Sequence, residues 1–199
     1  MDVAVKMIEK DITASSERSD RFLREVMMLS RVEHDNLVKF IGAEVEPELV
    51  IVTELMRGDS LQNYLRNMRP CRPELRQIIS FALDVSQGME CIHSNGIIHR
   101  DLKPANHFLF KLLLTEDCMK LKLAGIGMAR EKEAGEMMTC EASTYKWMAP
   151  ESYSKEPLER GRKKHYDQKV DVYSFSLVFW ELLTNSTRRE CPACRQHLR

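Results

Sequence analysis

The chain has 199 residues, of which 43% are hydrophobic and 30% are charged, a balance that is typical of globular domains and excludes wholesale disorder. Basic and acidic residues are equal in number, 30 each, which argues against a protein that binds nucleic acid through its overall charge. No signal-peptide pattern opens the chain, no segment reaches the length of a membrane span, and the six cysteines are not spaced as a secreted disulfide framework. We therefore expect a cytoplasmic protein without membrane insertion.

The first part of the chain predicts a strand, a helix and two more strands, over residues 3–8, 19–31, 37–41 and 49–53. In the first strand, Ala4 and Lys6 would share one face, because side chains in a strand alternate with a period of two. The helix carries an apolar stripe at helical spacing, and Glu25 lies beside that stripe. A small sheet with one helix is therefore expected before a turn signal at Gly58.

The remainder of the chain predicts a mainly helical half. Helices are expected over residues 60–65, 74–93 and 172–183, and a hairpin between the short apolar runs 112–114 and 121–124. Ser60 is the expected cap of the first of these helices. The last helix is apolar on nearly every side, so we expect it to be buried in a sizeable core.

The strongest motif lies in the loop after the long helix, where residues 99–106 read HRDLKPAN. This pattern matches the catalytic loop of protein kinases, in which the aspartate accepts the proton of the substrate hydroxyl and the asparagine binds a magnesium ion. Asp101 and Asn106 hold these two positions. The alternative is an ordinary surface turn after a helix, and it is disfavoured because neighbouring motifs agree with a kinase.

The first strand contains the second motif, VAVK at residues 3–6. It matches the kinase strand whose lysine holds the α- and β-phosphates of ATP. Glu25 on the following helix would pair with Lys6, and a buried ammonium group needs such a countercharge. The alternative is an edge strand with a solvated lysine.

Residues 3 to about 185 resemble the plant Raf-like serine/threonine kinases of the mitogen-activated kinase kinase kinase type. The resemblance is carried by RFLREV at 21–26, VIVTEL at 50–55, YKWMAPE at 145–151 and KKHY at 163–166. It implies an α+β, bilobal fold with ATP in the cleft between a small sheet lobe and a helical lobe. The implied division is a partial first lobe, a partial second lobe and a divergent tail, over residues 1–57, 58–185 and 186–199.

The resemblance also implies further site residues. Lys103 would touch the transferring phosphate, and a lysine at this position is the serine/threonine version of the loop. Around the nucleotide, the resemblance places Ala4, Thr53 as gatekeeper, and the backbones of Glu54 and Met56. These assignments rest on the resemblance, because spacing alone would not single these residues out.

The activation segment is implied to end at Glu151, and Thr144 would help to bind the protein substrate. Activating phosphorylation usually occurs in this segment, where the chain has hydroxyl groups at Thr139, Ser143 and Thr144. Each of them could equally be an exposed loop residue. Arg100 is the natural cation to receive such a phosphate, and Asp171 would brace the backbone of the catalytic loop.

The sequence departs from the family pattern at four places. The chain begins at the lysine strand, so we expect no glycine-rich loop and two fewer strands. Gly125 stands where the family has the aspartate that holds magnesium, and we expect no nearby carboxylate to replace it. Residues 107–111 look inserted. The family signature stops near Asn185, so we expect a domain that is truncated at both ends.

Two weaker patterns carry little weight. Cys191, Cys194 and His197 are three potential zinc ligands where a structural site needs four. The basic cluster at 160–164 is better explained as a solvated loop than as a nucleic-acid site.

Three functions remain open from the sequence. The first is a serine/threonine kinase with impaired transfer, using ATP and Mg²⁺ on a protein substrate that could be a downstream kinase. The second is a pseudokinase that docks partners or nucleotide without turnover, and the third is a non-functional kinase fragment. The sequence does not predict the oligomeric state.

Overall fold

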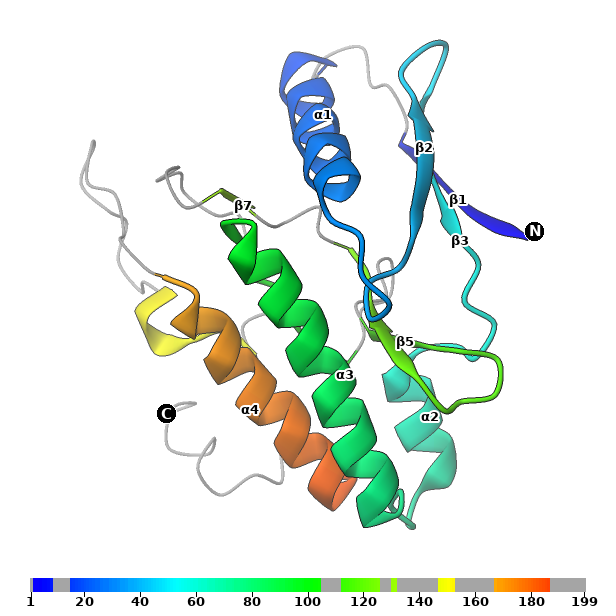
Figure 1. The fold of residues 1–199 in the computed structure, drawn as a ribbon, viewed down its shortest axis with the longest axis vertical. Helices are drawn as coiled ribbons and strands as arrows, with labels where there is room; N and C mark the ends of the chain where they lie inside the picture. The colour runs from blue at the N-terminus through cyan, green and yellow to red at the C-terminus, as the bar shows by residue number, and fades with distance from the viewer. Residues whose placement is uncertain are drawn as a thin grey trace.

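A computed structural model describes residues 2–8, 15–104, 112–125, 130–131, 147–152 and 167–186 of the chain. A small sheet with one helix lies above a helical half (Figure 1), which confirms the expected α+β class. Within the described ranges, no helix is both long enough and apolar enough to cross a membrane.

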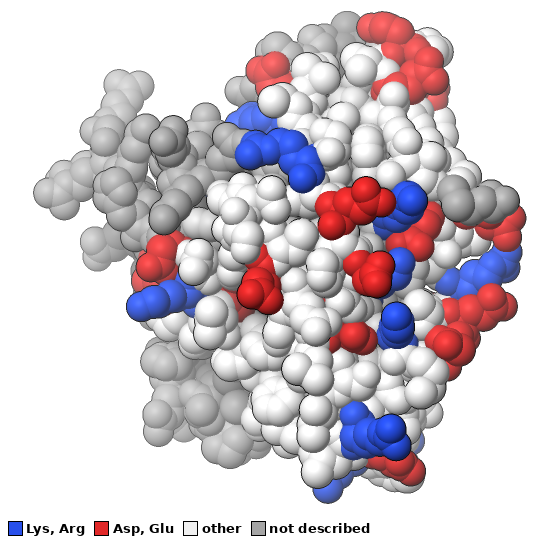
Figure 2. Space-filling model, in the orientation of Figure 1, with Lys and Arg blue, Asp and Glu red and all other residues white. Residues whose placement is uncertain are grey.

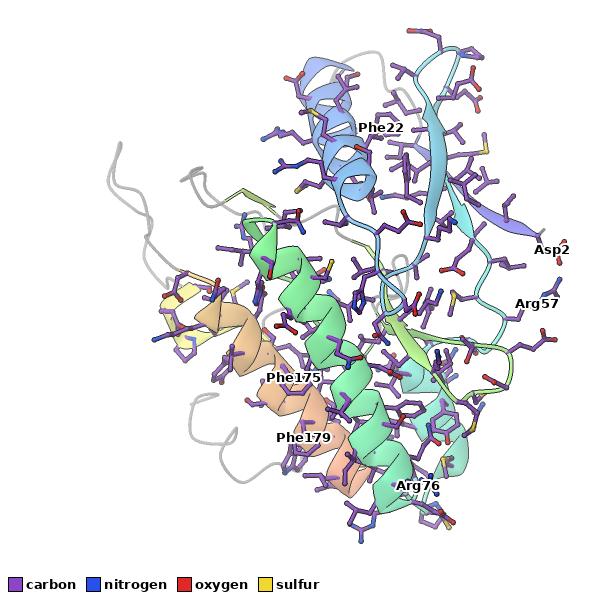
Figure 3. All side chains as sticks on the ribbon, in the orientation of Figure 1. Asp2, Phe22, Arg57, Arg76, Phe175 and Phe179 are labelled. Carbon is purple, nitrogen blue, oxygen red and sulfur yellow. The ribbon has the colours of Figure 1, made fainter. Side chains whose placement is uncertain are left out.

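The upper part is an antiparallel three-stranded sheet in the order β1-β3-β2. Its strands are β1 (Val3–Ile8), β2 (Phe40–Glu44) and β3 (Leu49–Glu54). One helix, α1 (Ser15–Arg31), packs against this sheet. Figure 3 shows Phe22 between α1 and the sheet, where it is only 1% exposed. Alternate residues of the central strand, Leu49 and Ile51, are buried in the same core.

The strand expected at residues 37–41 is displaced along the chain, and that prediction is wrong in its bounds. The sheet strand begins at Phe40, and its register shifts between Phe40 and Gly42. The residues before it bond to the helical half instead, because Val38 N donates to the Leu123 carbonyl at 2.7 Å. This short segment is therefore a link between the two halves.

Among the described residues, the lower part is built from three helices and short strand pairs. The helices are α2 (Leu61–Met68), α3 (Leu75–Ser94) and α4 (Lys169–Thr184). The strand pairs are β4 (Ile97–Ile98) with β7 (Arg130–Glu131), and β5 (Leu112–Leu114) with β6 (Leu121–Leu123). A 3₁₀ turn spans Pro150–Ser152. Ser60 caps α2 as predicted, since its Oγ accepts a hydrogen bond from Asn63 N at 3.3 Å.

Helices α3 and α4 lie side by side (Figure 1) and share the main core with α1, β3 and the β5–β6 hairpin. The prediction that the last helix is buried in the core is correct for one part of its surface and wrong for another. Val178 and Leu182 are fully buried, but Val172 is 58% exposed. Phe175 and Phe179, labelled in Figure 3, are packed against the core from partly buried positions. Apolar composition around a helix does not by itself decide which of its faces is covered.

The β5–β6 hairpin is fixed to both halves by hydrogen bonds. Asp84 on α3 accepts from Leu121 N at 2.8 Å and from the Asn36 amide at 2.9 Å. Asn36 also accepts, through its carbonyl, a bond from Leu123 N at 2.8 Å. The strand that leads to Gly125 therefore has a defined position relative to the upper sheet.

Gly58 fixes the other end of the hairpin, where the chain leaves the upper sheet. Its N–H donates to the Leu114 carbonyl at 3.1 Å. A Cβ at this position would lie 1.9 Å from the carbonyl oxygen of Thr115, so the close approach of the two backbones requires glycine.

Acidic side chains gather at the top of the face shown in Figure 2, over the turn between β2 and β3, where Glu44, Glu46 and Glu48 are exposed. Lower on this face, basic and acidic side chains are interspersed. The described surface in this view is therefore not dominated by one sign of charge.

Candidate active site

Lys6 and Glu25 form an ion pair between β1 and α1. The Lys6 Nζ lies 2.8 Å from Oε1 and 2.9 Å from Oε2 of Glu25. Lys6 lies on the half-buried face of β1, and the Glu25 side chain is only 8% exposed. The pairing expected from the sequence is thus formed, and it satisfies a carboxylate that would otherwise be buried without a countercharge.

The catalytic-loop motif is held by a single carboxylate at the start of α4. Asp171 accepts from His99 N at 2.8 Å and from Arg100 N at 2.7 Å, and it is 1% exposed. The His93 ring on α3 lies 2.9 Å from the same carboxylate. The predicted brace is present in the geometry, and His93 is a third partner that the sequence analysis did not identify.

Arg100 adopts a backbone conformation that side chains rarely take, with a φ of 67°. Such a conformation costs about 1–2 kcal/mol for a residue with a Cβ. The two hydrogen bonds to Asp171 hold the loop in this shape, so the carboxylate offsets local strain in addition to satisfying buried amides.

Asp101 and Lys103 face each other at the end of this loop. The Lys103 Nζ lies 2.8 Å from the Asp101 Oδ1, and the two side chains are 1% and 8% exposed, respectively. A carboxylate beside an ammonium group is the arrangement in which one group accepts a proton while the other stabilises negative charge.

The residues that the resemblance places around the nucleotide lie on β1, at the end of β3 and just after it, in the segment that we call the hinge. Ala4 is the cross-strand partner of Thr53. The Glu54 N–H is already used in a bond to the Lys39 carbonyl at 2.9 Å. An adenine bound beside this strand would therefore have to donate a hydrogen bond to the Glu54 carbonyl, because the Glu54 N–H is already engaged. Met56 follows β3 by two residues and is half-buried.

Glu54 has a second role that the sequence analysis missed. Its Oε1 lies 2.7 Å from Lys122 Nζ on β6 and accepts from Lys39 N at 2.8 Å. Lys122 lies between two buried leucines in a strand, so the alternation of side chains predicts that it points away from the core. The sequence does not predict its partner, because Glu54 is 68 positions away.

Gly125 follows β6 and has a φ of 70°. Glycine adopts this conformation without strain, but it contributes no side-chain ligand. Within the described ranges, no three residues among histidine, cysteine, aspartate and glutamate gather in a way that could hold a metal ion. At the position where a kinase has its metal-binding aspartate, this chain therefore offers magnesium no side-chain ligand.

The remaining predicted residues are placed only in part. Asn106, Thr139, Ser143, Thr144, the 107–111 insertion, the basic cluster at 160–164 and the tail from 187 onward lie outside the described residues. Glu151 lies in the 3₁₀ turn and is exposed. The segment before it is tied to α4, because Ser174 Oγ donates to the Trp147 carbonyl at 2.7 Å and Trp147 Nε1 donates to Glu181 at 3.2 Å.

A groove of about 460 Å³ lies between α3 and α4. It is bordered by His93 and Asp171 but by none of Lys6, Glu25 and Asp101. The groove is therefore not lined by the ion-paired residues described above, although it is bordered by Asp171, which holds the catalytic loop.

A family model described as protein tyrosine and serine/threonine kinase matches residues 1–196. The chain is 40% identical to the serine/threonine-protein kinase STY46 of Arabidopsis thaliana over 184 residues, which cover 92% of the chain and 29% of that protein. It is 39% identical to the serine/threonine/tyrosine-protein kinase HT1 of the same plant over 186 residues, 92% of the chain and 44% of that protein. It is 38% identical to the serine/threonine-protein kinase CTR1, also from this plant, over 190 residues, 92% and 21% respectively. The chain thus spans less than half the length of these relatives.

Proposed function

The chain belongs to the protein kinase family, with plant Raf-like kinases among its relatives, and we propose that it is a serine/threonine kinase domain whose phosphoryl transfer is impaired at Gly125. The observation that carries the proposal is the geometry of residues 99–103, in which Asp171 holds the backbone and the Asp101 carboxylate lies 2.8 Å from the Lys103 ammonium group.

In this proposal each of the chain's own residues has a separate role in phosphoryl transfer. Lys6, oriented by Glu25, holds the α- and β-phosphates of ATP, and Asp101 accepts the proton of the attacking hydroxyl. Lys103 stabilises the charge on the transferring phosphate. Serine and threonine are the proposed acceptors because the loop carries this lysine.

Kinases use ATP together with a divalent metal, and magnesium is the ion that we expected from the sequence. Gly125 supplies no carboxylate ligand for this ion, so no step of the proposal depends on the metal. The loss of one charged ligand accounts for the impairment, because each 1.36 kcal/mol of lost transition-state stabilisation slows the reaction about tenfold.

The wider assignments belong to the same proposal. The substrate is a protein, with a downstream kinase as the candidate, and the setting is cytoplasmic. The lobes are residues 1–57 and 58–185, followed by a divergent tail at 186–199. Thr139, Ser143 and Thr144 are the proposed phosphorylation sites, and Asn106 the remaining metal ligand.

The second candidate is a pseudokinase, a module that binds nucleotide or partners without turnover. It is favoured by one observation: Gly125 stands at the position of the family's metal-binding aspartate and carries no side-chain ligand.

Transfer of radiolabelled phosphate from ATP to a general protein substrate tests the proposal. We expect low turnover by the natural chain and a gain of at least about tenfold in Gly125→Asp. Gly125→Asn is the matched control, because asparagine tolerates the same backbone but provides no charge. Asp101→Asn in the Gly125→Asp background should abolish the gain.

The alternatives give different results in the same experiment. Equal, negligible turnover by the natural chain and by Gly125→Asp would refute the kinase proposal. A cooperative thermal transition would then leave the pseudokinase. The absence of any cooperative transition would instead identify a fragment that does not fold.

A further inference from the structure

Strand β1 forms one edge of the three-stranded sheet. Among the described residues, β3 is its strand partner, and the two strands pair without a register shift. Alternate side chains of β1, those of Val3, Val5 and Met7, are 40%, 55% and 63% exposed. The charged residue of this strand, Lys6, lies on the other face and is paired with Glu25. The exposed face of β1 is therefore apolar along its whole length.

The opposite edge of the same sheet has a different character. β2 contains a register shift between Phe40 and Gly42, and its last residue, Glu44, is exposed. Edge strands of soluble proteins usually carry such an irregularity, a charge or a proline, because a regular edge with free backbone groups pairs with other chains. The exposed face of β1 carries none of these three features, so β1 is the edge that is open to pairing.

The backbone direction of β1 follows from its neighbour. Glu54 N donates to the Lys39 carbonyl, on the β2 side of β3, at 2.9 Å. Because successive residues of a strand direct their backbone groups to opposite sides, Thr53, the cross-strand partner of Ala4, directs its groups toward β1. Ala4 and Lys6 therefore bond to β3. The residues of β1 whose N–H and C=O groups point to the open edge are Val3, Val5 and Met7.

These three residues are self-complementary when two copies of β1 run antiparallel. With Val5 of one copy opposite Val5 of the other, Val3 lies opposite Met7, and each opposed pair can exchange two backbone hydrogen bonds. The exposed apolar side chains of both copies then share one face, and Ala4 lies opposite Lys6 on the other.

Shifts from this register are unfavourable in both directions. A shift of two residues one way places Lys6 opposite Lys6, and like charges that face each other across two strands are destabilising. A shift of two residues the other way leaves Met7 beyond the first residue of the partner's β1. The register centred on Val5 is therefore the one that uses all three outward-facing residues without opposing two charges.

From this arrangement we infer that two copies of the chain associate through β1. Their sheets join into one antiparallel sheet with three strands from each copy and a twofold axis at Val5. The inference does not depend on the proposed kinase function. One pair of short strands is a small interface, so we expect a dissociation constant of about 1–100 μM.

Sedimentation equilibrium of the natural chain tests the inference, in a reducing buffer because the chain has six cysteines. We expect a reversible monomer–dimer equilibrium. Val5→Lys places two ammonium groups opposite each other on the axis and should weaken the dimer at least about tenfold. Leu83→Lys is the matched control, because Leu83 is also 55% exposed but lies on α3, and it should leave the dimer unchanged.

A pair of opposite charges locates the axis. Val5→Glu alone should weaken the dimer as Val5→Lys does, whereas an equimolar mixture of the two variants should restore it, because a lysine then faces a glutamate. Both variants should melt as the natural chain does, since the Val5 side chain is largely exposed in the monomer.

Two results would overturn the inference. The first is a natural chain that stays monomeric at concentrations well above the expected dissociation constant. The second is a dimer that folded Val5→Lys leaves intact, because such a dimer uses another surface. A mixture of Val5→Lys and Val5→Glu that stays monomeric would refute the register centred on Val5.

Discussion

The catalytic loop at 99–103 and the metal motif at the end of β6 both contain a residue with left-handed backbone, but they accommodate it differently. Each follows a short strand, and each contains one residue in the left-handed region, Arg100 with a φ of 67° and Gly125 with a φ of 70°. Arg100 has a side chain that opposes this conformation, whereas Gly125 has none.

The two segments differ in how far their conformation depends on contacts with other elements. The catalytic loop keeps a strained residue and is held by hydrogen bonds from α4, so its chemistry depends on distant support. In the metal motif the left-handed residue is a glycine, for which this conformation carries no strain, and the carboxylate of the motif is missing. The loop that retains its chemical groups is therefore expected to be far more sensitive to mutation than the loop that has lost one.

The largest effect is expected from Asp171→Ala. This change leaves two buried amide groups without an acceptor and removes the support for the strained Arg100 backbone. We expect a loss of about 3–5 kcal/mol in the free energy of unfolding, measured by urea denaturation. The control is Asp167→Ala at the exposed start of α4, where loss of a bond to Lys169 N should cost about 1 kcal/mol. Equal costs for the two variants would contradict the bracing role of Asp171.

The next effect concerns the anchor of the hairpin that carries the metal motif. In Gly58→Ala the new methyl group would meet the Thr115 carbonyl at 1.9 Å, so the hairpin or the hinge must move. We expect a loss of about 3 kcal/mol or more. At Gly42 a methyl group would meet no atom within 4 Å, and Gly42→Ala should cost less than about 1 kcal/mol. Thermal melts of the two variants provide the measurement.

A smaller effect tests the metal motif directly. Gly125→Ala places a Cβ in the left-handed region and should cost about 1–2 kcal/mol. Gly125→Asp and Gly125→Asn should cost less, because both side chains tolerate this region better than alanine does. Urea denaturation of the three variants checks the order. If alanine were tolerated as well as asparagine, the backbone at this position would not be left-handed.

The smallest effect is expected at the link between the hinge and the hairpin. Lys122→Met removes a partly buried ion pair with Glu54 and should cost about 1 kcal/mol. Lys39→Met removes an exposed pair with Glu33 that is longer, at 3.7 Å, and should be nearly neutral. A Lys122→Met variant as stable as Lys39→Met would show that the link contributes little.

The parts of the site that follow from local patterns could be predicted from the sequence. The pairing of Lys6 with Glu25 was expected because a lysine inside a strand needs a countercharge, and the Ser60 cap because of its residue type before a helix. The position of Asp171 near the catalytic loop came from the resemblance to kinases, since no local rule joins residues that are 72 positions apart.

The rest depended on tertiary partners that sequence patterns do not specify. Residues 37–41 read as a sheet strand, but Leu37 pairs with Leu123 of the hairpin. The second partner of Glu54 is equally distant, because Lys122 approaches only after the hairpin has docked on Asn36 and Asp84. Exposure of Val172 is likewise decided by which elements cover α4.

The left-handed backbone at Gly125 has a consequence for the history of the chain. Glycine and aspartate both accept this conformation, so exchange between them changes the ligand without forcing the loop to a new path. A form of the domain with the metal-binding aspartate and a form without it would then differ by one substitution, which the same fold tolerates. Selection could move such a domain between signalling by catalysis and signalling by binding, in either direction, without an unstable intermediate.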